Sequence, residues 1–379
     1  MSAKHFDYII IGNGLAGLQL ALAFAEDSFF HDKKVALIDP DKKQVNDKTW
    51  SFWEKTPTKF NHLVYKSWQK ALFYGNQSKK ELNLTPYTYK SIQSIDFYTH
   101  AFNVLKTKSN FQFILDEVIS VDSNIISVNT KNETYTASHV FDSRIPDDFF
   151  NDNNKAISIV QHFKGWTIKT DEAIFNPEAI TMMDFRLKDG NQTTFTYVLP
   201  FSETEALIEF TFFTKDLVED AVYDSYLKRY ISEQLNISNY TITEVEKGQI
   251  PMTNFPFEKY NTKNITKIGT AGSWVKGSTG YSFKHTEKKV SQILENLKSN
   301  QKPSKNLFIS KYKFYDKVFL KVLSDSNEKG EWIFSQFYTK NGIQTMFSFL
   351  DEESSFTEDL KIMMSLFSWS FIKAFFKTL

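Results

Sequence analysis

The sequence contains no cysteine among its 379 residues. Disulfide bonds, thiolate nucleophiles and cysteine-ligated metal sites are therefore excluded. Its 45 basic and 45 acidic residues cancel to a formal net charge of zero. A balanced charge argues against a strongly electrostatic partner, so we expect no nucleic acid among the partners.

The sequence also lacks an apolar segment long enough to span a bilayer, which takes roughly 20 residues of helix. The apolar stretch 8–25 is interrupted by Gly12, Gly14 and Gly17, and the stretch 362–372 is too short. The first residues do not form a basic region followed by a separate apolar stretch, so we expect no targeting segment. We predict a cytoplasmic protein, with peripheral association with a membrane surface left open.

Phenylalanine is unusually frequent, at 37 residues. A biased genomic composition and a large apolar cavity lined by aromatic side chains both remain open as explanations. The charged and hydrophobic fractions, 24% and 41%, are those of an ordinary globular protein. The length allows two domains, or one large domain with an insertion.

The N-terminal region has the pattern of a strand–turn–helix–strand unit. Residues 6–11 form an apolar, β-branched run that is typical of a buried parallel strand. A GxGxxG sequence follows at 12–17, and 15–26 is rich in alanine and leucine, which favours a helix. Residues 34–38 then predict a second strand. This context is that of a dinucleotide-binding site.

Each glycine of the motif has a physical role in such a site. Gly12 allows the tight turn, Gly14 lets the backbone approach the pyrophosphate, and Gly17 lets helix and strand pack closely. Asp39 lies 22 residues after Gly17, close to the spacing of a ribose-binding acid. The alternative is an ordinary strand–helix turn, and the motif alone does not separate FAD from NAD. The predicted contacts are Gly12, Gly14, Leu15, Ala16, Gly17 and Asp39.

Beyond the motif, the sequence predicts a strand-rich middle and a helical end. Strands are predicted at 118–128, 134–141, 157–168, 194–199, 206–213 and 265–268, and helices at 220–235, 283–297 and 358–377. We assign 1–50, 110–154 and 250–300 to a discontinuous FAD-binding domain, and 51–109, 155–249 and 301–379 to a substrate-binding region.

A second glycine-rich loop at 269–272 lies between a predicted strand and a predicted helix. Its backbone N–H groups can face a pyrophosphate or a flavin ring, and a surface loop is the alternative. The cofactor contacts predicted in this part of the chain are Gly269, Ala271, Gly272, Gly280 and Tyr281.

Four segments in collinear order resemble the lycopene cyclase family. They are GNGLAG at 12–17, NDKTWSFW at 46–53, the region 197–211 that includes LIEFT, and IGTAGSWVKGSTGYSF at 268–283. The sequence FLDE at 349–352 fits as well, so the resemblance covers most of the chain.

The resemblance implies an α/β fold of the aromatic-hydroxylase type. In it, a Rossmann-like FAD-binding domain carries an inserted antiparallel β-sheet substrate domain and a helical C-terminus. It implies cyclisation of the linear ends of lycopene to β-ionone rings, giving γ-carotene and then β-carotene. That reaction has no net redox change but requires reduced FAD, with NAD(P)H as a possible reductant.

The functional acid of the family corresponds to Glu209. Many members carry a second acid at the next position, which here is Phe210, so a paired carboxylate is in question. Cyclisation begins with protonation of an alkene, which a buried carboxylic acid can perform because burial raises its pKa. Strand alternation places Phe213 on the face of Glu209, and Phe210 and Phe212 on the other. A carboxylate exposed to water is the alternative.

Other polar and apolar groups have simpler explanations. No histidine has a partner at helical metal spacing, and we expect His62, His100, His139, His162 and His285 to be structural or exposed. We expect Asp142 and Arg144 to support the flavin domain. The predicted helix 358–377 has a broad apolar surface, which indicates either core packing or an entrance facing a membrane. That surface comprises Met363, Leu366, Phe367, Phe371 and Phe375.

Two other functions share the fold and the first motif. A flavin-dependent monooxygenase or an isoprenoid reductase would consume NAD(P)H stoichiometrically. A non-catalytic flavin- or carotenoid-binding protein would be indifferent to substitution of Glu209.

Overall fold

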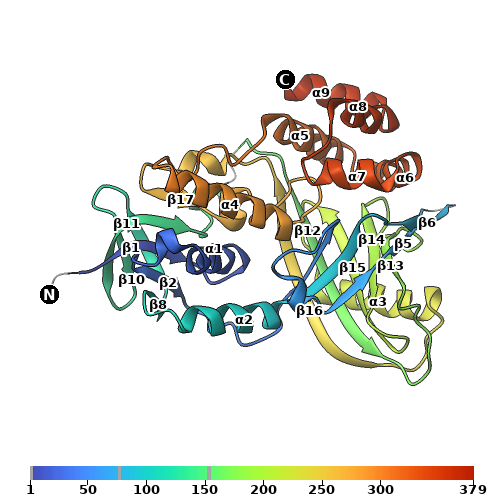
Figure 1. Ribbon diagram of the computed structural model, residues 1–379. Coiled ribbons are helices and arrows are strands. Elements are labelled where there is room, and N and C mark those ends of the chain that lie inside the picture. Colours follow the sequence, from blue (N-terminus) through green and yellow to red (C-terminus); the bar gives the residue numbers. More distant parts are fainter. Residues whose placement is uncertain (1–2, 76–77, 152–154) are drawn as a thin grey trace.

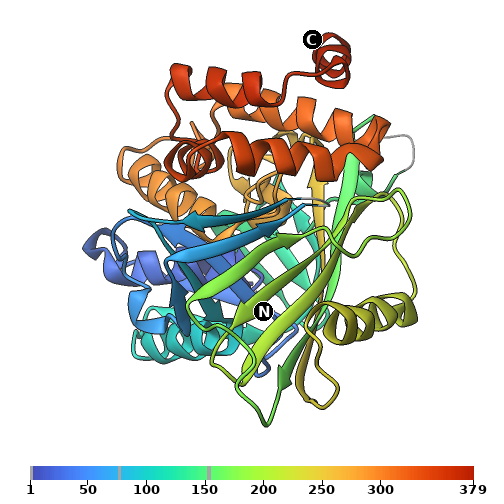
Figure 2. The ribbon, with the colours of Figure 1, turned by 90° about the vertical axis from the view of Figure 1, so that its right-hand side faces the viewer.

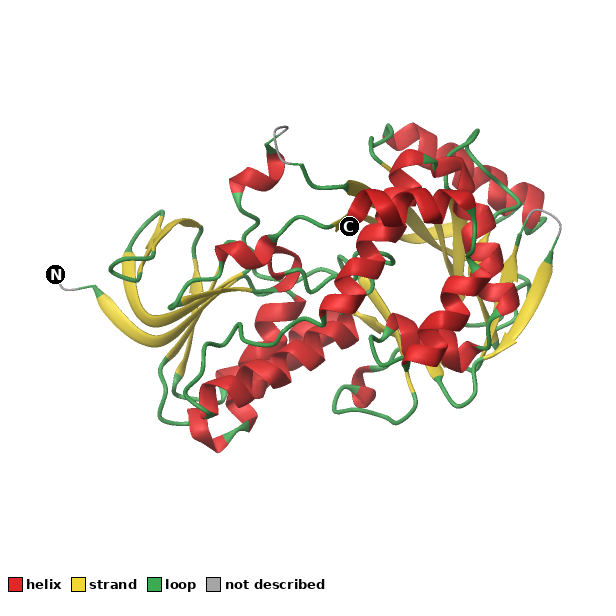
Figure 3. Ribbon diagram, turned by 90° about the horizontal axis from the view of Figure 1, so that it is seen from above, coloured by secondary structure: helices red, strands yellow, loops and turns green. Residues whose placement is uncertain are grey.

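A computed structural model describes residues 3–75, 78–151 and 155–379 of the chain. Two large sheets lie side by side, and helices from the C-terminal part of the chain cover the second one (Figure 1). The view from above shows the same division, with the N-terminus beside the first sheet and the C-terminal helices gathered over the second (Figure 3).

The first sheet has the strand order β8-β2-β1-β11-β10-β9, and β17 pairs with β11. Strands β8, β2, β1, β11 and β17 run parallel, and β9 and β10 extend β11 as an antiparallel meander. Their bounds are β1 Lys4–Ile11, β2 Val35–Asp39, β8 Phe111–Leu115, β9 Val118–Asp122, β10 Ser127–Thr130, β11 Thr134–Asp142 and β17 Ile265–Lys267.

Three helices and a small sheet complete this half. Helix α1 (Leu15–Glu26) packs against α2 (Ser94–Lys106) and α4 (Phe283–Lys298). The apolar faces of these helices share one core with side chains of β1 and β2. A three-stranded sheet of β3, β7 and β4 contacts this half through α2 and α4. Its strands span Thr49–Glu54, Thr88–Gln93 and Lys66–Trp68.

The second sheet has the order β16-β12-β15-β14-β13-β5-β6 and is antiparallel except where β13 meets β5. One face is covered by α3 (Asp220–Arg229), and α5 to α9 lie over the opposite side (Figure 2). The strands are β5 Lys70–Tyr74, β6 Lys79–Asn83, β12 Ser158–Lys169, β13 Ala179–Asp184, β14 Thr194–Pro200, β15 Glu205–Thr214 and β16 Thr241–Thr253. The helices are α5 Ser310–Asp325, α6 Gly330–Lys340, α7 Ile343–Leu350, α8 Phe356–Ser365 and α9 Trp369–Thr378.

Two predicted elements are wrong in detail, and a third is confirmed with a local change. Residues 118–128 form two strands, because Asp122 accepts a hydrogen bond from the backbone N–H of Asn124 and turns the chain. The predicted helix 220–235 is present, as α3 to Arg229 and one π-helical turn to Gln234. The region 358–377 is two helices, because Ser368 is extended and begins α9.

The predicted domain boundaries stay predictions. The boundary between 154 and 155 adjoins residues 152–154, which lie outside the described residues, as do the first two residues of the segment 1–50. Among the described residues, no helix is both long and apolar enough to cross a bilayer.

Candidate functional site

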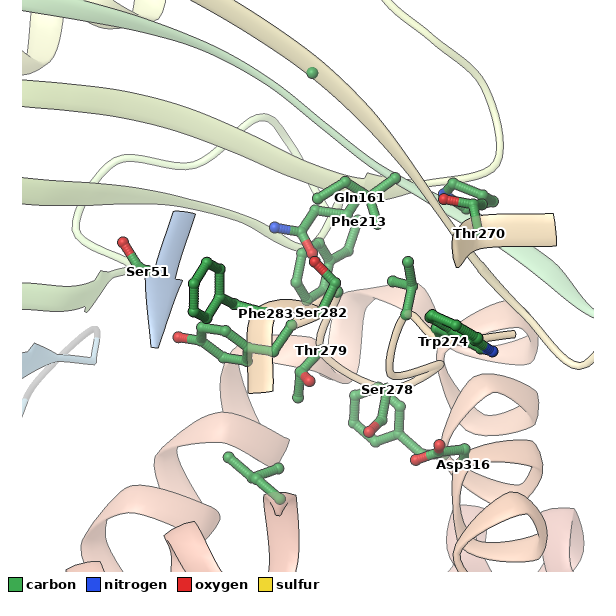
Figure 4. A pocket seen from close by; sticks show the side chains of 18 of the residues that line it. Ser51, Gln161, Phe213, Thr270, Trp274, Ser278, Thr279, Ser282, Phe283 and Asp316 are labelled. Atoms are coloured by element: carbon green, nitrogen blue, oxygen red, sulfur yellow. The ribbon is translucent and has the colours of Figure 1, made fainter. Parts of the chain in front are cut away.

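A cavity of about 860 Å³ lies between the two sheets and under the C-terminal helices. One end is lined by the glycine motif, the middle by the inner face of the second sheet, and the other end by α8 and α9. Figure 4 shows Gln161 and Phe213 of the sheet facing Thr279 and Ser282 of the loop before α4. One continuous space therefore joins the predicted nucleotide site to the predicted substrate region.

The glycine motif has the geometry of a phosphate-binding turn. Gly12 has a φ of +98°, and a Cβ at Gly17 would overlap the carbonyl oxygen of Gly12. Gly14 has open space where a Cβ would lie, and α1 begins at Leu15 without a side-chain cap. The first N–H groups of α1 therefore remain available for a phosphate. Gly12, Gly14, Leu15, Ala16 and Gly17 all line the cavity.

Asp39 lies at the end of β2 as predicted, but its carboxylate is engaged by the chain itself. It accepts hydrogen bonds from the backbone N–H of Asn13 at 2.6 Å and of Asp41 at 2.7 Å. Asp39 is not one of the described residues that line the cavity. Its observed contacts brace the glycine turn against β2, and its contact with a ribose stays a prediction.

The second glycine-rich loop, residues 269–272, packs against the glycine motif at the start of α1. A Cβ at Gly269 would lie 3.2 Å from that of Ala16, at the start of α1. Gly269, Gly280 and Tyr281 line the cavity, whereas Ala271 and Gly272 are buried behind the loop. A Cβ at Gly272 would lie 2.8 Å from the indole nitrogen of Trp274, so this glycine allows close packing.

Several polar atoms on the cavity wall are buried and have no hydrogen-bond partner within the described part of the chain. They are Gln161 Oε1, Trp274 Nε1 and Thr279 Oγ1. Buried polar groups are normally paired, so unpaired ones on a cavity wall indicate a polar ligand. The wall combines these atoms with an uncapped helix end, and both features fit a flavin dinucleotide.

Glu209 is on β15 and points into this cavity. Its side chain is buried, with a residue exposure of 8%, so the alternative of an open surface carboxylate is wrong. Thr211 donates a hydrogen bond to Oε1 at 3.0 Å. Burial, and next the charge of Glu246, raise the pKa of Glu209 to about 8. Glu209 therefore holds a proton at neutral pH.

The two faces of β15 differ as predicted. Phe213 lines the cavity with Glu209, whereas Phe210 and Phe212 pack under α3. Phe210 stacks on Tyr226 with ring centroids 4.4 Å apart. The residue after Glu209 thus points away from the cavity, because neighbours on a strand face opposite sides.

A network of tyrosine hydroxyls beside Glu209 was not predicted. The hydroxyl of Tyr89 lies 2.7 Å from that of Tyr197 and 3.1 Å from that of Tyr281. Tyr197 donates to Ser51 at 3.1 Å, and it is the register partner of Glu209 on β14. Burial raises the pKa of all three tyrosines well above the usual value, so they are neutral donors. Tyr197 begins one of the segments that carry the family resemblance, whereas no sequence pattern indicates Tyr89.

Buried ion pairs join the segments that lie far apart in sequence. Lys276 of the second loop pairs with Asp316 at 2.9 Å and with Glu352 at 3.3 Å. The indole of Trp53 donates to Asp351 at 2.8 Å. The segments 46–53, 268–283 and 349–352 therefore meet at one wall of the site.

The other candidate residues have structural partners. Asp142 accepts hydrogen bonds from Arg144 and Lys267 at the end of β11. His139 contacts the hydroxyl of Thr266, and His162 lies between Tyr223 and Thr214. His285 contacts the carbonyl oxygen of Leu350, and His62 contacts His100. No group of acidic and histidine side chains suited to a metal ion occurs within the described ranges.

Solved structures share this fold over nearly the whole chain. A geranylgeranyl bacteriochlorophyll reductase-like protein from Thermoplasma acidophilum is 13% identical with a TM-score of 0.63, and 100% of both chains is covered. A flavoprotein/dehydrogenase from Cytophaga hutchinsonii is 12% identical with a TM-score of 0.62, covering 92% of this chain and 93% of that one. The flavin-dependent brominase Bmp2 is 14% identical with a TM-score of 0.61, covering 96% and 93%.

These likenesses define the class: the chain has the fold of flavin-dependent oxidoreductases and halogenases, and the predicted fold class is confirmed. A comparison with curated proteins gave no significant match. The model of the lycopene cyclase protein family matches residues 7–375. The chain belongs to the lycopene cyclase family, as the four sequence segments indicated.

Proposed function

We propose that this protein is an FAD-dependent lycopene β-cyclase in which Glu209 is the proton donor. The observation that carries the proposal is the buried carboxyl of Glu209, which lines the same cavity as the uncapped N-terminus of α1. Membership of the lycopene cyclase family supports the substrate, lycopene and then γ-carotene.

The reaction follows from the chemistry of a protonated carboxyl in an apolar space. Glu209 transfers its proton to the terminal double bond of lycopene, which leaves a tertiary carbocation. An internal double bond attacks that carbon, forms the ring bond and moves the positive charge onto the ring. Loss of a proton from the ring then gives the β-ionone double bond, and Glu209 as a carboxylate is placed to take it back. The cyclic product therefore has the same atoms and the same oxidation state as the linear substrate.

The surroundings of Glu209 suit this sequence. Phe195 and Phe213 present aromatic rings on the cavity wall, with centroids 5.2 Å apart, and a ring face stabilises a nearby cation by about 0.5 to 2 kcal/mol. Gly12 to Gly17 would hold the pyrophosphate, and the unpaired atoms of Gln161 and Thr279 would be available to bind the flavin ring. Reduced FAD bound there would supply negative charge beside the carbocation.

The C-terminal helices fit the entrance for a lipid-dissolved substrate. Phe367, Trp369 and Phe376 are each at least 66% exposed, although they are large and apolar. Phe367 and Phe376 also line the far end of the cavity. A C40 hydrocarbon is carried in lipid, so we propose that α8 and α9 dock on a membrane surface with this apolar face.

The decisive test is expression in lycopene-producing bacteria, followed by chromatography of the pigments. We expect β-carotene or γ-carotene with the wild type, and persisting lycopene with Glu209→Gln. Glu205→Gln is the matched control, because Glu205 begins the same strand and is not among the described residues that line the cavity. Persisting lycopene with a folded, flavin-loaded wild type would overturn the proposal.

Protein purified from the same cultures distinguishes the alternative functions. A purified protein that consumes NAD(P)H stoichiometrically and changes the oxidation state of its substrate is a monooxygenase or a reductase. In a catalytic cyclase, one reduction of FAD, with NAD(P)H as one possible reductant, supports many turnovers.

Flotation with phosphatidylcholine vesicles tests the docking surface. We expect the wild type to float, and a Trp369→Ser/Phe376→Ser variant to float at least several-fold less. Phe150→Ser is the control, because Phe150 is 70% exposed but lies outside α8 and α9. If both variants lose flotation equally, the protein binds vesicles through nonspecific hydrophobic contacts and not through α8 and α9.

A further inference from the structure

The position after Glu209 is occupied by Phe210, yet a second carboxyl does reach the cavity. Strand β12 pairs with β15 on one side and with β16 on the other. Gly165 of β12 is the register partner of Glu209 on β15 and of Glu246 on β16. Residues opposite one another in an antiparallel sheet point to the same face, so both glutamates lie on the cavity side. Both line the cavity.

Gly165 is the reason that these side chains can approach each other. The backbones of β15 and β16 are two strand spacings apart, about 9.5 Å, and any side chain on β12 at this register would stand between them. A Cβ at position 165 would lie 2.9 Å from Cδ1 of Leu207, 3.2 Å from Cγ of Glu246 and 3.6 Å from Cβ of Glu209. The side chains of Leu207 and of the two glutamates therefore share the space that the glycine leaves free.

The two carboxyls have different neighbours. Glu246 accepts a hydrogen bond from the hydroxyl of Thr49 at 2.8 Å, and the ammonium of Lys48 also favours its ionised form. The negative charges of Asp47 and Glu244 raise the pKa of Glu246 and so favour its protonated form.

Glu209 faces the neutral hydroxyls of Tyr197 and Tyr281, and it accepts from Thr211. No lysine or arginine contributes to the pKa of Glu209 in the described part of the chain. Of the two carboxyls, Glu246 is therefore the better placed to carry the negative charge.

We propose that Glu209 and Glu246, which flank Gly165 on the cavity face of the sheet, form an electrostatically coupled carboxyl pair that holds one proton. Glu209 is the member that carries this proton and donates it to the substrate, and Glu246 is a positioning residue whose charge keeps the proton on Glu209. This inference rests on the proposed function. Two neighbouring carboxyls disfavour double ionisation because their charges repel, which is the logic of other paired-carboxyl sites.

The pair makes a reciprocal prediction that needs no substrate. Glu246 is half-buried, and its partial removal from water raises its pKa to about 7, while the pKa of the buried Glu209 is higher still. In Glu246→Gln, the repulsion is removed, so Glu209 should lose its proton about one pH unit lower than in the wild type. In Glu209→Gln, the midpoint of Glu246 should fall by a similar amount, because coupling is mutual.

Infrared difference spectroscopy of the purified flavoprotein measures both midpoints through the C=O stretch of protonated carboxyls. Glu205→Gln is the matched control, because Glu205 begins the strand of Glu209 and is not among the described residues that line the cavity. Glu246→Asp should return the Glu209 midpoint toward the wild-type value. An unchanged Glu209 midpoint in Glu246→Gln would overturn the pair.

The pH profile of cyclisation gives the functional readout. The alkaline limb of kcat/KM should move to lower pH by about one unit in Glu246→Gln, and it should not move in Glu205→Gln. A lower rate with an unmoved limb would show that Glu246 is only structural. Because the infrared titration uses the protein alone, its outcome stands even if the wild type does not cyclise lycopene.

Discussion

The two sheets present different kinds of surface to the same cavity. The first contributes backbone: the glycine turn after β1 and the open N-terminus of α1. The second contributes side chains, with Glu209 and Glu246 on strands that are not adjacent. A backbone site depends on a short local motif, whereas a side-chain site depends on the register of strands far apart in sequence. The two regions should therefore respond differently to substitution.

The largest effect is expected on the packed face of the second sheet. Phe212 is fully buried and stacks on His162, with centroids 4.9 Å apart. Phe212→Ala should lower the free energy of unfolding by about 3 to 5 kcal/mol. Phe213→Ala should cost about half as much, because Phe213 already adjoins open space. Urea denaturation measures both, and equal losses would contradict the difference between the two faces.

Next is the pH dependence of stability that Glu209 causes. Its folded-state pKa is raised, so its contribution to stability is fully present below the unfolded pKa and is lost as the pH rises through about 8. Glu209→Gln should therefore gain roughly 4 kcal/mol relative to the wild type between pH 4 and pH 8. Denaturation at several pH values tests this gain, and parallel curves for the two proteins would refute it.

A smaller effect is expected from the glycine turn, and it should fall on ligand binding. Gly17→Ala places a methyl group on the carbonyl oxygen of Gly12, so the turn must open. We expect FAD retention to fall about 100-fold, which is about 2.7 kcal/mol. Gly14→Ala should fold normally, because nothing lies near its Cβ, and should weaken FAD only through contact with the ligand. Flavin absorbance after gel filtration, with thermal unfolding alongside, separates these outcomes.

The smallest effect is expected where the two regions meet. Thr49, at the start of β3, donates to Glu246 across the cavity. Thr49→Val removes that hydrogen bond, which is worth about 0.5 to 1.5 kcal/mol, and should raise the pKa of Glu246 by less than one unit. The infrared titration detects such a change. If the Glu246 midpoint falls instead, Thr49 does not stabilise the ionised form.

Local patterns in the sequence were sufficient for the first region. The strand, the glycines, α1 and β2 occupy consecutive residues, and each obeys a short-range rule of spacing or propensity. Alternation along β15 likewise predicted that Phe213 shares the side of Glu209 and that Phe210 and Phe212 do not. These predictions required no knowledge of neighbouring strands.

Strand β16 shows why the second region was harder to predict. Its sequence, TITEVEKGQIPMT, has no clean apolar alternation, because β16 lies at the edge of the sheet and carries a glutamate on its cavity face. Helix α2 was missed as well, since five of its 13 residues are buried and its apolar positions are mixed with polar ones. Propensity is weak where burial on one face decides the structure.

The sequence by itself determined a dinucleotide-type turn, the lycopene cyclase resemblance and the acid at position 209, because each is carried by neighbouring residues. Only the tertiary structure decided that Asp39 braces the turn, that three tyrosines form a hydroxyl network beside the acid, and that Glu246 faces Glu209 over Gly165. The two acids are 37 positions apart in the chain, and Tyr89 and Tyr281 are 192 positions apart. Strand pairing sets such contacts, and strand pairing is a property of the folded sheet.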